Sequence, residues 1–252
     1  MKNIKNLLMA AVALLSMSST ASLIQPSYPP SEDTPYRVAI GLKSGLVKNP
    51  NGTGVNNIGG GIGFTHNVGY DFFWGLAASY DWASLGHNRV FGGNEHETGY
   101  AGSRIEVELS LGFMPEVAER FHVGGLFGFG WGHLFNKTVA EEAKALGIAF
   151  GDLNLRVGPA FSYGFTDMCG IYFAPAYTLT GIRFAKGDSQ FKELIKENSN
   201  LSGVELPVGL YFGASENVGF YLDVNTKFTD LRENHRKDSW REDFTLGMTF
   251  AM

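Results

Sequence analysis

Residues 104–113 alternate between two kinds of side chain at every position. The odd-numbered residues are large and apolar: Ile105, Val107, Leu109, Leu111 and Phe113. The even-numbered residues are charged or small: Arg104, Glu106, Glu108, Ser110 and Gly112. Successive side chains of a strand point to opposite faces, so the pattern predicts a strand with one apolar face and one charged face. An unpaired buried charge costs several kcal/mol, so the charged face must meet water or partner charges.

The same alternation recurs, between turns, from Tyr36 to the end of the chain. It predicts ten strands, near residues 36–43, 58–66, 72–82, 104–113, 121–133, 152–163, 170–182, 202–213, 220–228 and 241–252. The connections between strands alternate in length. Short turns lie at about 67–71, 114–120, 166–169 and 214–218, and longer links lie at about 47–57, 83–99, 134–151, 183–201 and 229–240. An even number of strands with short turns at one rim and long links at the other is the plan of a transmembrane β-barrel.

The predicted fold class is therefore all-β: an up-and-down antiparallel transmembrane β-barrel of about ten strands, with eight as the alternative. Both termini would lie at the rim that carries the short turns. A soluble barrel of the lipocalin kind also alternates, but its interior is apolar and its exterior polar. In this chain that arrangement would crowd the many aromatic side chains inside the barrel, which disfavours it.

The first residues have the pattern of a secretory signal peptide. Lys2 and Lys5 precede an apolar run at 7–15, and the small residues Ser19, Thr20 and Ala21 form a cleavage site. We therefore predict a signal peptide at 1–21, cleaved near Ala21. Residues 22–34, which contain three prolines, are predicted to be a flexible lead-in, and residues 35–252 the barrel.

Net charge and cysteine content bear on possible partners. The formal net charge is −5, and the 20 lysines and arginines are spread along the chain, so no basic surface for nucleic acid is predicted. The single cysteine, Cys169, excludes an internal disulfide framework. Nothing in the spacing of the histidines or carboxylates predicts a metal site, a cofactor site or a catalytic residue.

The charged faces of the strands would line the interior of the barrel. The predicted charge network of this lumen consists of Arg37, Lys43, Asp81, Arg104, Glu106, Glu108, Asp152, Arg156, Glu205, Asp223, Lys227 and Asp243. In a narrow interior, opposite charges would pair across the lumen. Two interpretations stay open: a structural salt-bridge network, and a narrow channel that favours cations because carboxylates outnumber basic groups in this set. Inward glycines such as Gly124, Gly128, Gly130 and Gly132 would leave room either for water or for bulky neighbours.

Aromatic side chains gather where a membrane would end. We predict a girdle of Tyr36, Phe72, Phe113, Phe121, Phe165, Phe212, Phe220 and Phe250 near the short-turn rim, and of Trp82, Trp131 and Phe228 near the long-link rim. A charge at lipid-facing Leu109 is expected to cost about 2–4 kcal/mol, and a charge at inward Ser110 less.

The last strand carries a family resemblance. Residues 244–252 alternate apolar side chains and bring Phe250 close to the end, which resembles the carboxy-terminal insertion signal of bacterial outer-membrane β-barrel proteins. The chain departs from that pattern because Ala251 and Met252 follow the aromatic residue. The resemblance implies a location in the bacterial cell outer membrane, insertion by the barrel-assembly machinery, and contact with outer-membrane lipid and lipopolysaccharide. It does not imply an activity.

These observations predict an integral outer-membrane barrel with a structural, adhesive, ligand-binding or narrow-pore role. Any specificity would lie in the long links, either as a binding surface for an extracellular ligand or host surface, or as a lid over a pore mouth. The alternative is an outer-membrane hydrolase or acyltransferase with its site at the long-link rim, for which Asp81 and His133 are the residues to test. Omptin proteases share a ten-stranded plan, but that resemblance stops at architecture.

Overall fold

The structure is a computed structural model. It describes residues 35–48, 54–69, 71–85, 100–138, 149–186, 200–230 and 239–252. The predicted signal peptide and lead-in lie outside these ranges, as does part of each of the five long links. The signal peptide, its cleavage site and the lead-in therefore remain predictions.

The described residues form one antiparallel sheet of twelve strands. In chain order these are β1 (Tyr36–Lys48), β2 (Gly54–Gly69), β3 (Phe72–Leu85), β4 (Tyr100–Phe113), β5 (Glu116–Ala118), β6 (Phe121–Thr138), β7 (Ala149–Gly164), β8 (Cys169–Phe173), β9 (Ala176–Lys186), β10 (Asn200–Gly213), β11 (Val218–Asp230) and β12 (Ser239–Ala251). No helix in the described part of the chain is long and apolar enough to cross a membrane.

Ten segments of the described sheet cross the barrel. β8 and β9 both pair with β7 and with β10 in one continuous register, so together they make a single crossing strand. β5 is a three-residue strand in the turn between β4 and β6, and it pairs only with β6. The prediction of ten strands is confirmed, and the alternative of eight is wrong.

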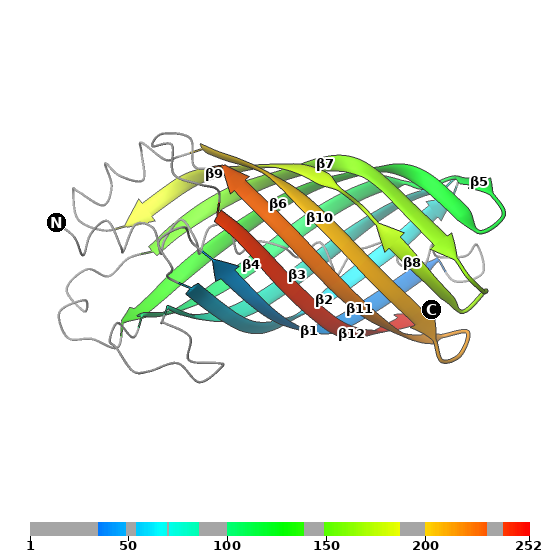
Figure 1. Ribbon diagram of the computed structural model, residues 1–252, viewed down its shortest axis with the longest axis horizontal. Helices are drawn as coiled ribbons and strands as arrows, with labels where there is room; N and C mark the ends of the chain where they lie inside the picture. The colour runs from blue at the N-terminus through cyan, green and yellow to red at the C-terminus, as the bar shows by residue number, and fades with distance from the viewer. Residues whose placement is uncertain are drawn as a thin grey trace.

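The first and last strands close the barrel. β1 pairs along its whole length with both β2 and β12. At the rim, the backbone N–H of Tyr36 donates to the oxygen of Met252 (3.2 Å), and the N–H of Met252 donates to the oxygen of Tyr36 (2.9 Å). Figure 1 shows the strands running obliquely around the barrel, with the C-terminus at the end that carries the short turns.

Burial alternates along the strands as the sequence predicts. On β4, Arg104 is fully buried, whereas Leu109, on the opposite face of the strand, is 43% exposed. In a closed single-layer barrel, a buried side chain points into the lumen and an exposed one points outward. The outer wall is therefore apolar and the lumen is partly charged, which is the arrangement of a transmembrane barrel and the reverse of a soluble one.

One predicted strand is interrupted. The sequence predicts a single strand over 170–182, but the structure breaks the ladder at Ala174 and Pro175, between β8 and β9. Proline has no N–H to donate. Pro159 lies at the same level of β7, between residues that pair with β9 and with β8, and Pro207 on β10 accepts the N–H of Ala174 (3.2 Å). Prolines on three neighbouring strands thus leave one level of the wall without three backbone N–H donors.

Candidate functional site

The lumen of the described barrel holds nearly balanced charge. Seven carboxylates and six basic side chains in the described ranges are almost completely buried there. They comprise all twelve residues of the predicted network, Arg37, Lys43, Asp81, Arg104, Glu106, Glu108, Asp152, Arg156, Glu205, Asp223, Lys227 and Asp243, together with Arg241. Arg241 was missed, although it shares the parity of Asp243 two residues later. With Arg241 included, the carboxylates of the lumen outnumber the basic side chains by one, so the cation preference that the sequence suggested is weakened.

Two ion pairs join β4 to β7 across the strand that separates them. Arg104 donates from Nη1 and Nη2 to the two carboxylate oxygens of Asp152, at 2.7 and 2.8 Å. Arg156 donates from Nη2 to Oε1 of Glu108 at 2.7 Å, and Ser110 donates to the same oxygen at 2.7 Å. Pairs buried this deeply are costly to break, because a lone charge would be left in the lumen.

Inward glycines of β6 make these pairs possible. A Cβ on Gly132 would lie 1.9 Å from Nη2 of Arg104, and a Cβ on Gly128 would lie 3.0 Å from Oε1 of Glu108. These glycines therefore hold room for the charged side chains that pass over β6. The sequence left water and bulky neighbours open as alternatives, and the structure shows bulky neighbours at both positions.

A glycine on the middle strand also leaves room for an ion pair between β1 and β3. Lys43, Gly59 and Asp81 lie side by side in the register of β1, β2 and β3. Nζ of Lys43 lies 3.4 Å from Oδ2 of Asp81, and a Cβ on Gly59 would clash with Oδ1 of Asp81 at 2.1 Å.

Two further ion pairs need no intervening glycine. Lys227 and Glu205 face each other directly across β11 and β10, with Nζ 3.0 Å from Oε1. Arg241 pairs with Asp243 on its own strand. The charged layer is thus assembled from pairs of different geometry.

Below the charges, towards the short-turn rim, the lumen is filled by aromatic and apolar side chains. Phe73, Met114 and Leu126 pack with Ala160 and Ala174. Three buried tyrosines lie against inward glycines of neighbouring strands: Tyr172 against Gly209, Tyr211 against Gly170 and Tyr221 against Gly247. In both layers the inward side chains are almost completely out of contact with solvent, so they occupy the described lumen.

Some polar atoms in the charged layer are left without hydrogen bonds. Neither carboxylate oxygen of Asp223 has a hydrogen-bond partner among the described residues, and the same holds for both amide atoms of Asn57. Buried polar groups normally find partners. These two side chains, on β11 and β2, are among the least satisfied of the lumen.

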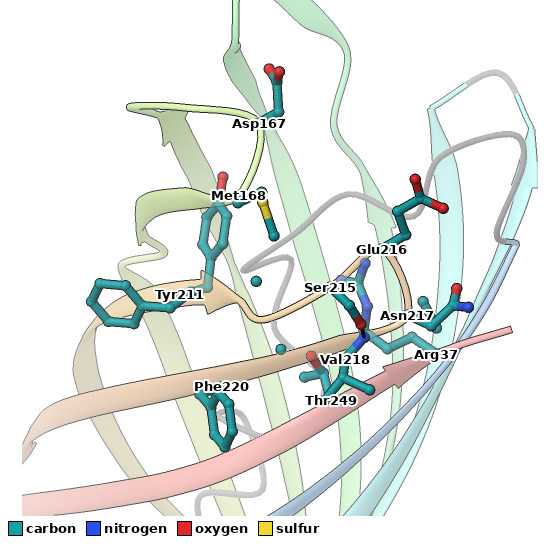
Figure 2. Close-up of a pocket in the computed structure, with 14 residues that line it drawn as sticks. Arg37, Asp167, Met168, Tyr211, Ser215, Glu216, Asn217, Val218, Phe220 and Thr249 are labelled. Atoms are coloured by element: carbon teal, nitrogen blue, oxygen red, sulfur yellow. Dashed lines mark hydrogen bonds between the residues drawn. The ribbon is translucent and has the colours of Figure 1, made fainter.

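A small pocket of about 180 Å³ lies at the short-turn rim (Figure 2). It is bounded by the turns that follow β7 and β10, through Asp167, Met168 and Ser215, and by Arg37 and Tyr211 of the barrel. Figure 2 shows Arg37 beneath the turn that carries Ser215 and Asn217. Arg37 of the predicted lumen network therefore lies near the mouth, apart from the ion pairs of the charged layer.

All eleven residues of the predicted girdle lie on the outer wall or in its turns. Nine of them are exposed: Tyr36, Phe72, Trp82, Phe113, Trp131, Phe165, Phe212, Phe220 and Phe228. Phe121 and Phe250 are half-buried. Several pack against one another, such as Phe72 and Phe113, whose ring centroids are 4.5 Å apart. Their role at the membrane boundary remains a prediction.

The two residues singled out as a test of hydrolase activity lie on opposite sides of the wall. Asp81 is fully buried in the lumen beside Lys43. His133 is opposite outward-facing Ile105 in the register and stacks on Trp131 on the outer wall, with ring centroids 5.8 Å apart. They form no catalytic pair. No group of three or more potential metal ligands occurs within the described ranges.

A closed ten-stranded antiparallel barrel with an apolar outer wall and a charged lumen defines a transmembrane β-barrel. The structure is similar to the translocator domain of the autotransporter NalP from Neisseria meningitidis, with a TM-score of 0.51 and 8% sequence identity over 98% of this chain and 96% of that one. A second similar structure is the outer membrane protease OmpT from Escherichia coli, with a TM-score of 0.46 and 10% identity over 86% of this chain and 96% of that one. These likenesses are of fold. No protein-family model matches the sequence, and comparison with curated proteins found no match.

Proposed function

We propose that this protein is a closed outer-membrane barrel that anchors surface-exposed segments for binding a ligand outside the cell. The observation that carries the proposal is the filled lumen, where ion pairs and aromatic side chains occupy the space that a pore would need. If the lumen does not conduct, the long links are the part of the protein left to recognise a specific ligand, because rigid scaffolds commonly carry recognition on their loops.

The proposed location rests on the outer wall and on the closing strand. Large apolar side chains are exposed around the described wall, a surface that water would not stabilise and that a bilayer covers. A closed barrel satisfies its backbone hydrogen bonds without an edge, as a membrane requires. The terminal pattern of 244–252 supports insertion by the barrel-assembly machinery.

The first test is conductance. The folded protein, recognised by its changed migration on a gel without boiling, is reconstituted in a planar bilayer. The proposal expects no stable single-channel steps above those of the protein-free bilayer. Reproducible steps in the wild-type protein would overturn it.

The second test is ligand binding by cells that display the protein. Cells expressing the wild-type chain would bind an immobilised host-surface ligand, for example heparin or fibronectin. Replacing residues 86–99 or 187–199 by a short glycine-serine link would remove binding while leaving the barrel folded. The matched control replaces residues 214–217, a short turn at the opposite rim. If neither replacement affects binding, these two links do not carry the recognition, and the same replacement is then made in the other three long links.

A narrow gated pore is the second candidate, and the unsatisfied polar groups favour it. Asp223 has no hydrogen-bond partner among the described residues, as expected of a lumen that also admits water in another arrangement of its side chains. Conductance that appears only at high applied voltage would support this candidate over the first. A hydrolase that used Asp81 and His133 together is disfavoured, since the two side chains face opposite sides of the wall.

A further inference from the structure

An apolar groove crosses the outer wall beside the short-turn rim, where β3, β4, β6 and β7 run side by side (Figure 1). Its volume is about 570 Å³. Phe72, Trp74, Phe113, Phe127 and Val157 are among the side chains that line it. Four of these are large exposed apolar side chains of the wall, and Trp74 is half-buried.

Gly125 is one of the residues that line the groove. It is an outward position of β6, opposite Phe113 on β4 and Pro159 on β7. A Cβ at Gly125 would meet only the backbone oxygen of Gly158, at the ordinary distance of 3.7 Å. Gly132, an inward glycine of the same strand, differs, because a side chain there would clash with Arg104. Packing thus does not require glycine at 125, and the missing side chain is what leaves the groove open.

The rim next to the groove carries an excess of negative charge. Asp71 in one turn and Glu116 and Glu119 in the next are exposed carboxylates. The two turns are joined by a hydrogen bond from the N–H of Met114 to the oxygen of Asp71, at 2.9 Å. Arg120, a basic residue in the second of these turns, lies 2.9 Å from the carboxylate of Asp167.

We propose that the groove binds one membrane phospholipid with an amine-bearing headgroup, of the phosphatidylethanolamine class. An acyl chain would lie over Gly125 between the aromatic side chains, since the groove opens on the part of the wall that lipid covers. The ammonium group would lie over the carboxylates of Asp71 and Glu119. The same carboxylates would repel a headgroup of net negative charge. This inference goes beyond the proposed function, because it holds whether or not the lumen conducts.

The test is retention of lipid by the folded, purified protein in native mass spectrometry. Phosphatidylethanolamine and phosphatidylglycerol with identical acyl chains are titrated in parallel. One bound phosphatidylethanolamine is expected, with about fivefold preference over phosphatidylglycerol, because surface charges contribute on the order of 1 kcal/mol each. Gly125→Leu would reduce retention of both lipids to the background. The matched control, Ala78→Leu, also introduces a leucine, at an outward position of β3 outside the groove, and would retain lipid as the wild type does.

A charge variant separates the headgroup from the acyl chain. The double variant Asp71→Asn and Glu119→Gln would still bind lipid but would lose the preference for the amine-bearing headgroup. Asparagine suits position 71, where the backbone φ is 63°, in the left-handed region. Equal retention of the two lipids by the wild type, or unchanged retention by Gly125→Leu, would mean adventitious lipid only and would overturn the proposal.

A second measurement covers the outcome in which Gly125→Leu does not fold. In a variant whose only tryptophan is Trp74, the other three being replaced by phenylalanine, phospholipid with brominated acyl chains would quench the fluorescence of Trp74. Phosphatidylethanolamine would quench at about fivefold lower concentration than phosphatidylglycerol. Equal quenching by both lipids at every concentration would also overturn the proposal. Each variant is checked first for the gel migration of the folded barrel.

Discussion

The guanidinium of Arg104 passes over Gly132 and donates two hydrogen bonds to the carboxylate of Asp152, two strands away around the barrel. The pair is fully buried. Three strands, β4, β6 and β7, are thereby joined inside the lumen as well as along their backbone ladders. The following variants test this relationship and others described above.

Arg104→Ala should lower the free energy of unfolding by about 3–5 kcal/mol, because it leaves the carboxylate of Asp152 buried without its charged partner. Urea unfolding of the folded barrel in lipid vesicles measures the loss. The control is Arg120→Ala, which removes an ion pair with Asp167 whose side chains are 43% and 84% exposed. That change should cost at most about 1 kcal/mol. Equal losses of unfolding free energy in the two variants would contradict the argument that burial makes the Arg104–Asp152 pair costly to break.

Gly132→Val should destabilise the barrel by about 1–3 kcal/mol, because the new side chain must displace Arg104 from its place over β6. Gly125→Ala, on the same strand but facing outward, should be close to neutral, since a Cβ there meets no atom nearer than 3.7 Å. The same unfolding measurement compares the two. A larger loss of stability in Gly125→Ala than in Gly132→Val would contradict the assignment of Gly132 to the inward face of β6 and Gly125 to the outward face.

Leu109→Arg should cost about 2–4 kcal/mol if Leu109 lies near the middle of the bilayer, and less if it lies near an interface. Val117→Arg is the matched control, because Val117 is also exposed and apolar but lies in β5 within a rim turn. Its cost should be under about 1 kcal/mol. Equal tolerance at both positions would place the bilayer elsewhere on the wall. Ser110, the comparison that the sequence suggested, is a poor control because it is buried and donates to Glu108.

Backbone amides beside Pro175 should exchange hydrogen for deuterium faster than amides in the middle of β11. The ladder is interrupted between β8 and β9, whereas β11 pairs without a break with β10 and β12. Mass spectrometry of peptides from the two regions measures the difference. Pro175→Val, which restores an N–H, should slow exchange in its own peptide and leave β11 unchanged. Uniform protection across both regions would mean that the prolines do not weaken the wall.

The course of the strands and the facing of their side chains could be predicted from the sequence. Parity suffices when one face carries charges and the other large apolar groups, as on β4, because a shift by one residue would reverse every side chain. The same rule would have placed Arg241 in the lumen, because it lies two residues before Asp243 and so shares its face of the strand. The interruption at Pro175 was missed because the alternation continues through it, from Tyr172 to Thr178.

The partners inside the lumen could not be predicted in the same way. Which charge meets which depends on the register and shear of the closed barrel, and these bring Arg104 to Asp152, 48 residues away along the chain. The purpose of Gly132 depends on that contact. Likewise, nothing local distinguishes Gly125 from the inward glycines except its parity, and the groove at Gly125 is lined by residues of four other strands as well as of β6.

The hydrogen bonds between Tyr36 and Met252 join the first strand of the barrel to the last. The first strand therefore lacks one of its two partners until the last strand has been synthesised. A chain that stops before residue 239 leaves the edges of β1 and β11 unpaired, and hydrocarbon offers no hydrogen bonds to satisfy them. Closure of the barrel therefore depends on β12, because without it the backbone groups of β1 and β11 have no partner in the bilayer.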